Sequence, residues 1–190
     1  IQLVIADVLA DAPSSGAAAL AALGSGGQQV DIAAVNNAIG GGKARDLMID
    51  SYRDFIRLPS ANKAYAVFLR GVATTQGSLA FHCTAGKDRT GWAAALLQTL
   101  AGVDSDTIME DYLRSNDLVS TKFGPLVDAF GAAGGDAAAL RQIIEVDPAY
   151  LQVAFDTLAA TYSSFDAYLR VGLGLENDEV SAIRERLTAG

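Results

Sequence analysis

The stretch that decides the fold is SLAFHCTAGKDRTGWAAALLQTL, residues 78–100. Residues 78–81 form a short apolar run that predicts a strand, and residues 92–100 form a longer run that predicts a buried helix. Between them lie the only histidine and the only cysteine of the chain, side by side at His82 and Cys83. A thiol therefore ends the predicted strand, a loop of small residues follows, and an arginine stands where the helix begins.

This loop has the chemistry of an anion-binding site. Five residues separate Cys83 from Arg89, which puts a thiol and a guanidinium at the two ends of one tight turn. Ala85 and Gly86 are small enough for backbone N–H groups to converge on one point, next to a helix N-terminus. Arg89 offers a planar fork that fits two phosphate oxygens. The same positive surroundings favour thiolate over thiol, so we expect Cys83 to act as a nucleophile.

Composition limits the class of protein. A chain of 190 residues suffices for one domain with a substantial core. The net charge of −8 argues against a nucleic-acid-binding protein, which normally presents a basic face. No apolar run is long enough for a transmembrane segment. One cysteine and one histidine exclude an intrachain disulfide and disfavour a zinc site, so we expect neither a metal nor a cofactor.

The N-terminal part of the chain predicts a strand followed by a long loop. Residues 1–5 are apolar and predict the strand, and residues 12–45 are rich in Ala, Gly, Ser and Asn and predict a flexible loop beside the site. The chain begins at Ile1 with neither a methionine nor a signal-like leader, so we expect that an N-terminal portion is missing. The sequence does not distinguish a cytoplasmic protein from a secreted one.

The remainder of the chain is predicted to be helical. Caps and breakers place the boundaries. Ser60 is predicted as the N-cap of a helix over residues 62–70, and Asp104 or Ser105 as the next N-cap. Breaks are predicted at Gly131 and at Gly134 and Gly135. A helix then runs from Asp147 and Pro148 to Gly172, and a last helix follows Asn177 and Asp178. Together with the two strands, these helices predict an α/β fold: one domain, residues 1–190, with a small, mostly parallel central sheet flanked by helices.

The run from His82 to Gly91 resembles the signature of cysteine-dependent phosphatases. That signature is His-Cys, five residues, then Arg followed by Ser or Thr, and Thr90 takes the hydroxyl position. The loop AGKDRTG is similar to that of the tyrosine and dual-specificity phosphatases of the mycobacterial PtpB-like family, which also resemble lipid phosphatases here. Residues 111–117, 162–170 and 172–175 are similar to further stretches of the same family.

The resemblance implies a bacterial phosphatase with a phosphotyrosine-phosphatase-like fold. Such an enzyme hydrolyses phosphomonoesters without a metal, through a phosphocysteine intermediate. Its substrates would be phosphotyrosine proteins, with phosphoserine, phosphothreonine and phosphoinositides as further substrates, and a phosphate or other oxyanion would bind in the loop. The helices within residues 118–172 would form a lid over the pocket.

The resemblance also assigns roles to the loop residues. Cys83 would attack phosphorus, and His82 and Thr90 would support the loop. Lys87 adds a second cation, which favours more heavily phosphorylated head groups. The residues expected to bind the phosphoryl group are Thr84, Ala85, Gly86, Lys87, Asp88 and Arg89.

The reaction needs a general acid to protonate the leaving oxygen. Residues 3–8 resemble the family segment that presents the catalytic aspartate, which favours Asp7, although Val4 stands where the family has proline. Asp88 and Asp11 are the alternatives. Two other functions remain open: a pseudophosphatase that binds phosphorylated partners without turning them over, and arsenate reduction, which is disfavoured because no second cysteine is present to resolve the intermediate.

Overall fold

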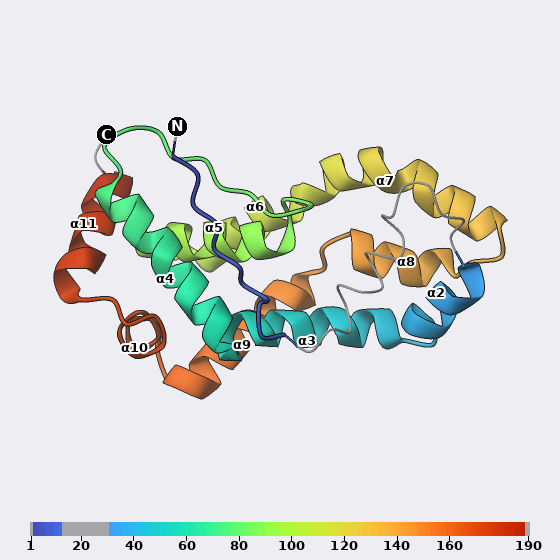
Figure 1. The fold of residues 1–190 in the computed structure, drawn as a ribbon, viewed down its shortest axis with the longest axis horizontal. Helices are drawn as coiled ribbons and strands as arrows, with labels where there is room; N and C mark the ends of the chain where they lie inside the picture. The colour runs from blue at the N-terminus through green and yellow to red at the C-terminus, as the bar shows by residue number, and fades with distance from the viewer. Residues whose placement is uncertain (1, 13–30, 189–190) are drawn as a thin grey trace.

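The computed structural model describes residues 2–12 and 31–188, and within these residues the regular structure is helical (Figure 1). Labels follow Figure 1. The elements are α2 (Ile32–Ile39), α3 (Lys43–Arg57), α4 (Pro59–Thr74), α5 (Asp88–Leu100), α6 (Ser105–Leu113), α7 (Ser115–Ala132), α8 (Ala137–Ile144), α9 (Pro148–Tyr162), α10 (Phe165–Ala167), the π-helix η1 (Tyr168–Gly172) and α11 (Asn177–Thr188).

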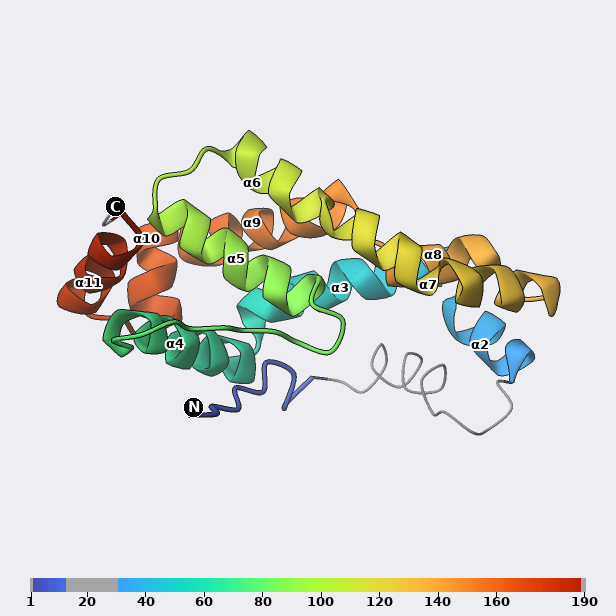
Figure 2. The same ribbon diagram turned by 90° about the horizontal axis from the view of Figure 1, so that it is seen from above.

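The helices form an elongated molecule, with α2, α7 and α8 at one end and α10 and α11 at the other (Figures 1 and 2). Helices α8 and α9 pack along α3, and α7 packs on α8. At the opposite end, α11 packs on α4 and α5. Helix α5 therefore lies between the two ends, and the loop before it lies near the middle of the molecule.

The prediction of an α/β fold with a mostly parallel sheet is wrong for the residues that the structure describes, because it contains no strand there. Residues 2–7 and residues 78–83 do run without helix or turn, as predicted strands would. Neither segment, however, has ladder hydrogen bonds to another described segment. Leu3 and Ile5 are 81% and 84% exposed instead of covered by a sheet neighbour. An apolar run indicates that a segment can be a strand, but only a paired neighbour makes it one.

The predicted loop over residues 12–45 is also partly wrong. Residues 13–30 lie outside the described residues. After them, α2 begins where the Asp31 side chain accepts a hydrogen bond from the Ala34 N–H at 3.0 Å. Val35 and Ile39, one helical turn apart, are both buried. A side-chain N-cap and a buried apolar pair outweigh the small-residue composition that suggested a loop.

Several predicted helix boundaries are confirmed. Helix α5 covers the predicted buried helix, and Asp104 caps α6 by accepting the Thr107 N–H at 2.9 Å. Asp147 and Pro148 begin α9 as N-cap and first residue. That helix ends at Tyr162 and not at Gly172, because Ser163 takes a left-handed conformation at φ 68°.

Other boundaries differ from the prediction. Helix α7 continues through Gly131 and ends at Ala132, before the predicted break at Gly134. Helix α4 begins at Pro59, and Ser60 is not its N-cap. The Ser60 hydroxyl instead donates to the Val8 carbonyl at 2.9 Å and contacts the Asp11 carboxylate. These bonds tie the N-terminal segment to the start of α4.

The core joins α5 to the helices around it through aromatic side chains. Trp92 is fully buried and packs edge-to-face on Phe155 of α9, with ring centroids 5.1 Å apart, and tilted against Tyr168 of η1 at 6.4 Å. Tyr52 of α3, also fully buried, packs on Tyr150 of α9 at 5.7 Å. Large buried rings dominate the energy of such packing, so α5 is held from several sides.

For two glycines inside helices, we expect replacement by alanine to have opposite effects on the free energy of unfolding. A Cβ on Gly91 of α5 would lie 2.9 Å from a ring carbon of Tyr112, whereas a Cβ on Gly71 of α4 would make an ordinary contact with Leu79 at 3.8 Å. We expect Gly91→Ala to lower the free energy of unfolding by about 1–3 kcal/mol through overpacking. We expect Gly71→Ala to raise it by about 0.5–1 kcal/mol, because alanine is the better helix former. Urea denaturation of the two variants measures both effects, and equal effects would contradict the close packing of α5 on α6.

Candidate active site

The loop that precedes α5 is shaped by one glycine and by the helix start. Gly86 has φ +75°, a left-handed conformation that residues with a side chain rarely adopt, and this turns the chain into the helix. Asp88 is the first residue of α5, so its negative charge complements the helix N-terminus. Arg89 is the second residue and projects from the same turn, as the sequence predicted.

Cys83 lies half-buried in this loop with donors aimed at it. The Gly86 N–H donates to its Sγ at 3.3 Å, and the Thr90 hydroxyl accepts the Cys83 N–H at 2.9 Å. Partial burial by itself raises the pKa of the Cys83 thiol. Hydrogen bonding with Thr90 and Gly86, together with the charge of Arg89, lowers it by more. The resulting pKa lies below the ordinary value for cysteine, which favours the nucleophilic thiolate.

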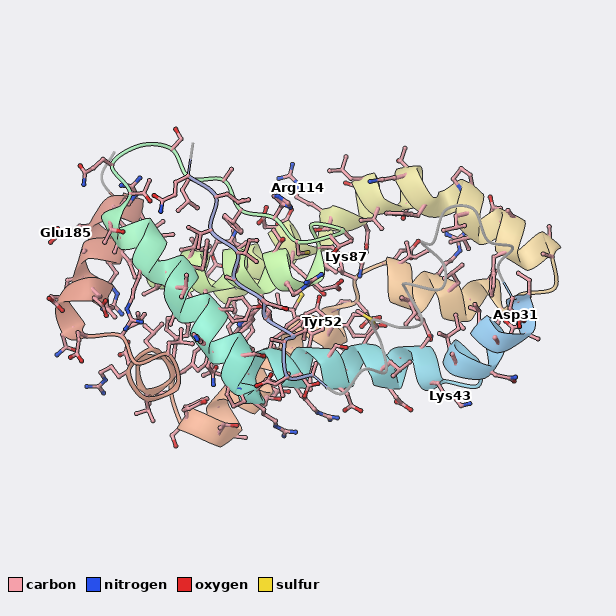
Figure 3. All side chains as sticks on the ribbon, viewed as in Figure 1. Asp31, Lys43, Tyr52, Lys87, Arg114 and Glu185 are labelled. Carbon is pink, nitrogen blue, oxygen red and sulfur yellow. The ribbon has the colours of Figure 1, made fainter. Side chains whose placement is uncertain are left out.

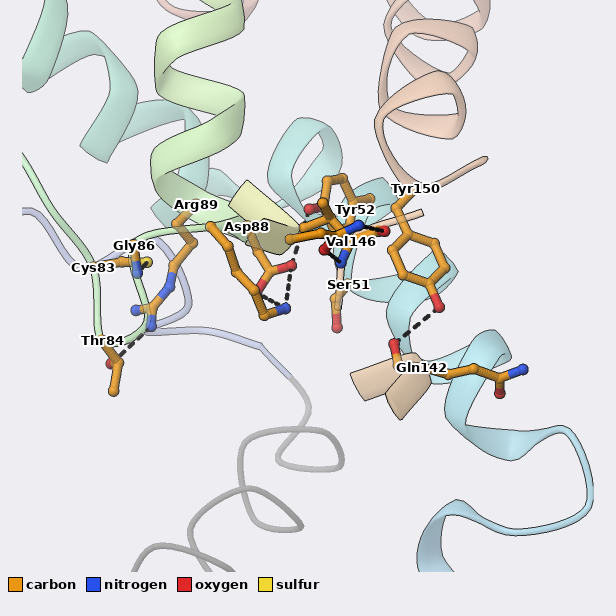
Figure 4. Close-up of polar contacts among 12 residues, drawn as sticks. Ser51, Tyr52, Cys83, Thr84, Gly86, Asp88, Arg89, Gln142, Val146 and Tyr150 are labelled. Carbon is orange, nitrogen blue, oxygen red and sulfur yellow. Dashed lines mark hydrogen bonds and ion pairs between the residues drawn. The ribbon is translucent and has the colours of Figure 1, made fainter. Parts of the chain in front are cut away.

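The Arg89 guanidinium crosses the loop. Its Nη2 donates to the Thr84 hydroxyl at 3.1 Å, so the side chain spans the turn from its end to its beginning (Figure 4). His82 does not take part in this contact across the loop. Its ring is exposed, and its Nδ1 is 3.1 Å from the Cys83 carbonyl oxygen. The structure thus brings together the thiol, the guanidinium and the hydroxyls of Thr84 and Thr90.

The side chains of Lys87 and Asp88 point toward the interior of the molecule. The Lys87 side chain is 5% exposed, and its ammonium lies 2.7 Å and 2.6 Å from the two Asp88 carboxylate oxygens. The hydroxyl of Tyr52, on α3, donates to Oδ1 of the same carboxylate at 3.0 Å. Figure 3 places Lys87 and Tyr52 near the middle of the molecule, and Figure 4 shows Asp88 beside Tyr52.

Tyr52 and Tyr112 are site residues that sequence reasoning missed. Their hydroxyl oxygens are 2.6 Å apart, and both side chains are buried. Burial raises the pKa of both phenols, and the nearby Asp88 charge adds to the rise, so both stay protonated. No local pattern marks these tyrosines, because their partner lies 36 residues from one and 24 from the other along the chain.

The two N-terminal aspartates do not contact the loop in the part of the chain that the structure describes. Asp7 is exposed, and its Oδ1 accepts the Leu9 N–H at 3.1 Å. Asp11 binds the hydroxyl and the N–H of Ser60, and this hydrogen bonding lowers the pKa of its carboxyl. Figures 2 and 4 show the N-terminal segment passing beside the loop, which leaves Asp7 on a neighbouring but separate element.

A groove of about 450 Å³ opens beside the loop, between α5, α6 and the start of α7. It shares Gly86 and Thr90 with the loop, and Arg114 lies on its wall. The remaining lining residues are Gly91, Ala94, Gln98, Asp111, Tyr112, Ser115, Asp117 and Leu118. A substrate held at Cys83 would therefore have this groove next to it for the groups that flank its phosphate.

Among the residues that the structure describes, no three side chains of histidine, cysteine, aspartate or glutamate cluster as metal ligands would. None of the described helices combines the length and the apolar character needed to cross a membrane.

A cysteine with a lowered pKa, a crossing arginine and a helix N-terminus in one loop are the parts that an oxyanion-binding site requires. Comparison with known proteins agrees. A family model described as "Tyrosine phosphatase family" matches residues 10–189. The chain belongs to this tyrosine phosphatase family, and the family predicted from the signature is confirmed.

Individual relatives support the same family. A tyrosine-protein phosphatase of Cupriavidus necator is 36% identical over 146 residues, which cover 75% of this chain and 50% of the relative. The triple specificity protein phosphatase PtpB of Mycobacterium tuberculosis is 34% identical over 154 residues, which cover 72% of this chain and 53% of the relative. A tyrosine-protein phosphatase of Nostoc commune matches 46 residues at 54% identity, covering 24% of this chain and 16% of the relative. The chain spans about half the length of the first two relatives.

The geometry of the loop predicts how Cys83 titrates. Thr90→Val keeps the shape of the side chain but removes the hydroxyl, so the thiolate loses a hydrogen bond and the thiol pKa rises. Below that pKa we expect about tenfold less thiolate, since a hydrogen bond to a charged group is worth about 1.5 kcal/mol or more. The pH dependence of alkylation by iodoacetamide measures this, because the chain has only one cysteine.

Thr99→Val is the matched control for this measurement. Thr99 lies on the same helix, and its hydroxyl donates to the Ala95 carbonyl at 2.7 Å, away from the thiol. This variant should titrate as the wild-type protein does. If both variants shift the thiol pKa equally, the specific effect of Thr90 is refuted.

Proposed function

We propose that the protein is a phosphatase that hydrolyses phosphotyrosine without a metal, through a cysteinyl-phosphate intermediate. The observation that carries the proposal is the half-buried Cys83, whose pKa is lowered by donors of the same loop that Arg89 crosses. Membership of the tyrosine phosphatase family supports it. The same loop would bind free phosphate or another oxyanion.

The reaction proceeds in two steps. In the first, the Cys83 thiolate attacks phosphorus in line, the bond from phosphorus to the ester oxygen breaks, and a general acid protonates that oxygen. The N–H groups of residues 84–89 and the Arg89 guanidinium hold the phosphoryl oxygens. In the second step, water attacks phosphorus and gives a proton to the carboxylate that the general acid became in the first step. The bond from phosphorus to sulfur breaks, inorganic phosphate leaves, and Thr90 stabilises the returning thiolate.

Asp7 is the general acid that we propose, with Asp88 as the alternative. Asp7 is exposed, and within the part of the chain that the structure describes only one of its carboxylate oxygens accepts a hydrogen bond, from the Leu9 N–H. Asp88 belongs to the loop itself, but its oxygens face Lys87 and Tyr52. Accessibility therefore favours Asp7.

We propose phosphoserine, phosphothreonine and phosphoinositides as further substrates. The relative from Mycobacterium tuberculosis that is named for triple specificity supports this breadth. The helices within residues 118–172 are the proposed lid, and Leu118 at the start of α7 lines the groove beside the loop while 78% exposed. The alternative function is a pseudophosphatase, which would bind the same ligands without releasing phosphate.

Replacement of the nucleophile tests the proposed function. Cys83→Ser leaves a hydroxyl that does not ionise at neutral pH, so release of phosphate should fall to background while phosphopeptide binding persists. Phosphate release from a chromogenic aryl phosphate without added metal is the measurement. Parallel assays on phosphotyrosine and phosphoserine peptides and a phosphoinositide give the substrate breadth. Retained turnover in the variant would refute the cysteinyl-phosphate mechanism, and binding without turnover in the wild-type protein would establish the pseudophosphatase.

The general acid is tested through the pH profile of kcat. Asp7→Asn cannot donate a proton, so kcat should fall by about 10²–10⁴-fold and lose the decline at high pH that deprotonation of the donor causes. Asp46→Asn, at an exposed position on α3, is a control that makes the same chemical change away from the loop. An Asp7→Asn profile of wild-type shape and height would exclude Asp7 as the donor.

A further inference from the structure

A chain of hydrogen bonds connects the first residue of α5 to two other helices. The carboxylate of Asp88 only accepts, so the single hydroxyl hydrogen of Tyr52 is directed to it at 3.0 Å. The Tyr52 oxygen is then the acceptor for Tyr112, whose hydroxyl lies 2.6 Å away. From the other side, the Lys87 ammonium donates to both carboxylate oxygens. The direction of every hydrogen bond in this series is therefore fixed, and the series leads from both sides to Asp88.

The groups in this chain are buried and paired. Tyr52 is 0% exposed, Tyr112 and Lys87 are each 4% exposed, and the Asp88 side chain is 20% exposed. A buried charge that loses its partner is strongly destabilising. Both carboxylate oxygens of Asp88 accept from the buried ammonium, and Oδ1 also accepts from Tyr52, so loss of Asp88 would leave that ammonium without its partner.

We propose that Asp88 is a positioning residue: held by Lys87 and Tyr52, and through Tyr52 by Tyr112, it fixes the first turn of α5 and thereby the placement of Arg89 across the loop. Arg89 is the next residue along the chain, and the first-turn N–H groups face the same loop. Tyr52 and Tyr112 act through Asp88 and are positioning residues as well. This inference rests on the proposed function, in which the loop binds a phosphoryl group.

Two consequences follow for the reaction. Asp88 is not the proton donor, because each of its oxygens is engaged by an interior donor. The Lys87 ammonium is not a second phosphate ligand either, because Asp88 holds it inside the molecule. Lys87 then offers only its backbone N–H to a bound phosphate. Its ammonium, which the sequence predicted as a second cation that favours phosphoinositides, is occupied by the ion pair with Asp88.

The test compares two variants. One removes a hydroxyl that takes part in the hydrogen bonds leading to Asp88, and the other removes a hydroxyl that does not. Tyr52→Phe deletes the bond to Asp88 and disconnects Tyr112. Tyr150→Phe is the matched control: its ring packs on Tyr52 at 5.7 Å, but its hydroxyl donates to the Gln142 carbonyl at 3.0 Å, away from Asp88 (Figure 4). Both variants lose one buried phenol hydroxyl. Only Tyr52→Phe also takes a hydrogen-bond donor away from Asp88.

Two readouts require no turnover. One is the pH dependence of Cys83 alkylation by iodoacetamide, and the other is the concentration of inorganic phosphate that protects Cys83 from alkylation. For Tyr52→Phe we expect a raised thiol pKa and about tenfold weaker protection by phosphate, as the loss of a hydrogen bond to a charged group implies. Tyr150→Phe should match the wild-type protein in both. Equal behaviour of the two variants would overturn the proposal.

Further variants separate this proposal from its alternatives. If Tyr52→Phe fails to fold, Tyr112→Phe carries the test, with a smaller loss in the same direction expected and no difference from Tyr150→Phe overturning the proposal. Asp88→Asn should lower kcat but keep its decline at high pH, and loss of that decline would make Asp88 the donor and refute the positioning role. If the wild-type protein releases no phosphate, the proposed function fails, yet alkylation and phosphate protection still decide whether the chain of hydrogen bonds positions the loop.

Discussion

The ion pair between Lys87 and Asp88 is the constraint on which the site depends. Two opposite charges are taken out of water at the junction of the loop and α5, with the ammonium 2.6 Å from the carboxylate. Such a pair is tolerated only when further hydrogen bonds satisfy it. Tyr52 supplies that bond and, with Tyr112, requires α3, α5 and α6 to meet at this point. The helical packing and the loop therefore have to form together.

The loop is held rigidly at its base, where Lys87 and Asp88 join it to α5. Its tip, at Ala85 and Gly86, consists of small residues. The base is fixed by the buried pair and by the close approach of Gly91 to the Tyr112 ring. The tip needs Gly86 in a left-handed conformation so that its N–H reaches the Cys83 sulfur. These donors are oriented by contacts within the loop and with α5, and donors held in this way stabilise a charge without having to reorganise. The thiolate and a bound phosphoryl group would then use the same donors.

The sequence predicts those parts of the structure that depend on neighbours along the chain. The buried helix over residues 92–100, the cap at Asp104 and the start at Asp147 and Pro148 are all set by neighbouring residues, and they are correct. The contact between Tyr52 and Asp88 is not predictable in this way, because it joins residues 36 apart. The predicted sheet failed for the same reason: residues 2–7 and 78–83 have the composition of strands, but pairing depends on a neighbour that composition does not specify.

The anchoring of the N-terminal segment explains why Asp7 and Asp11 differ as candidates for the general acid. Ser60 binds Asp11 and the Val8 carbonyl, so the segment is fixed immediately after Asp7. The Asp11 carboxylate is occupied by that anchor, whereas Asp7 remains exposed with one oxygen bonded to the Leu9 N–H. A proton donor must reach the leaving group and yet avoid the tight hydrogen bonding that would keep it ionised. Asp88 and Asp11 both hold parts of the structure together through their hydrogen bonds, which is why Asp7 is the general acid that we propose.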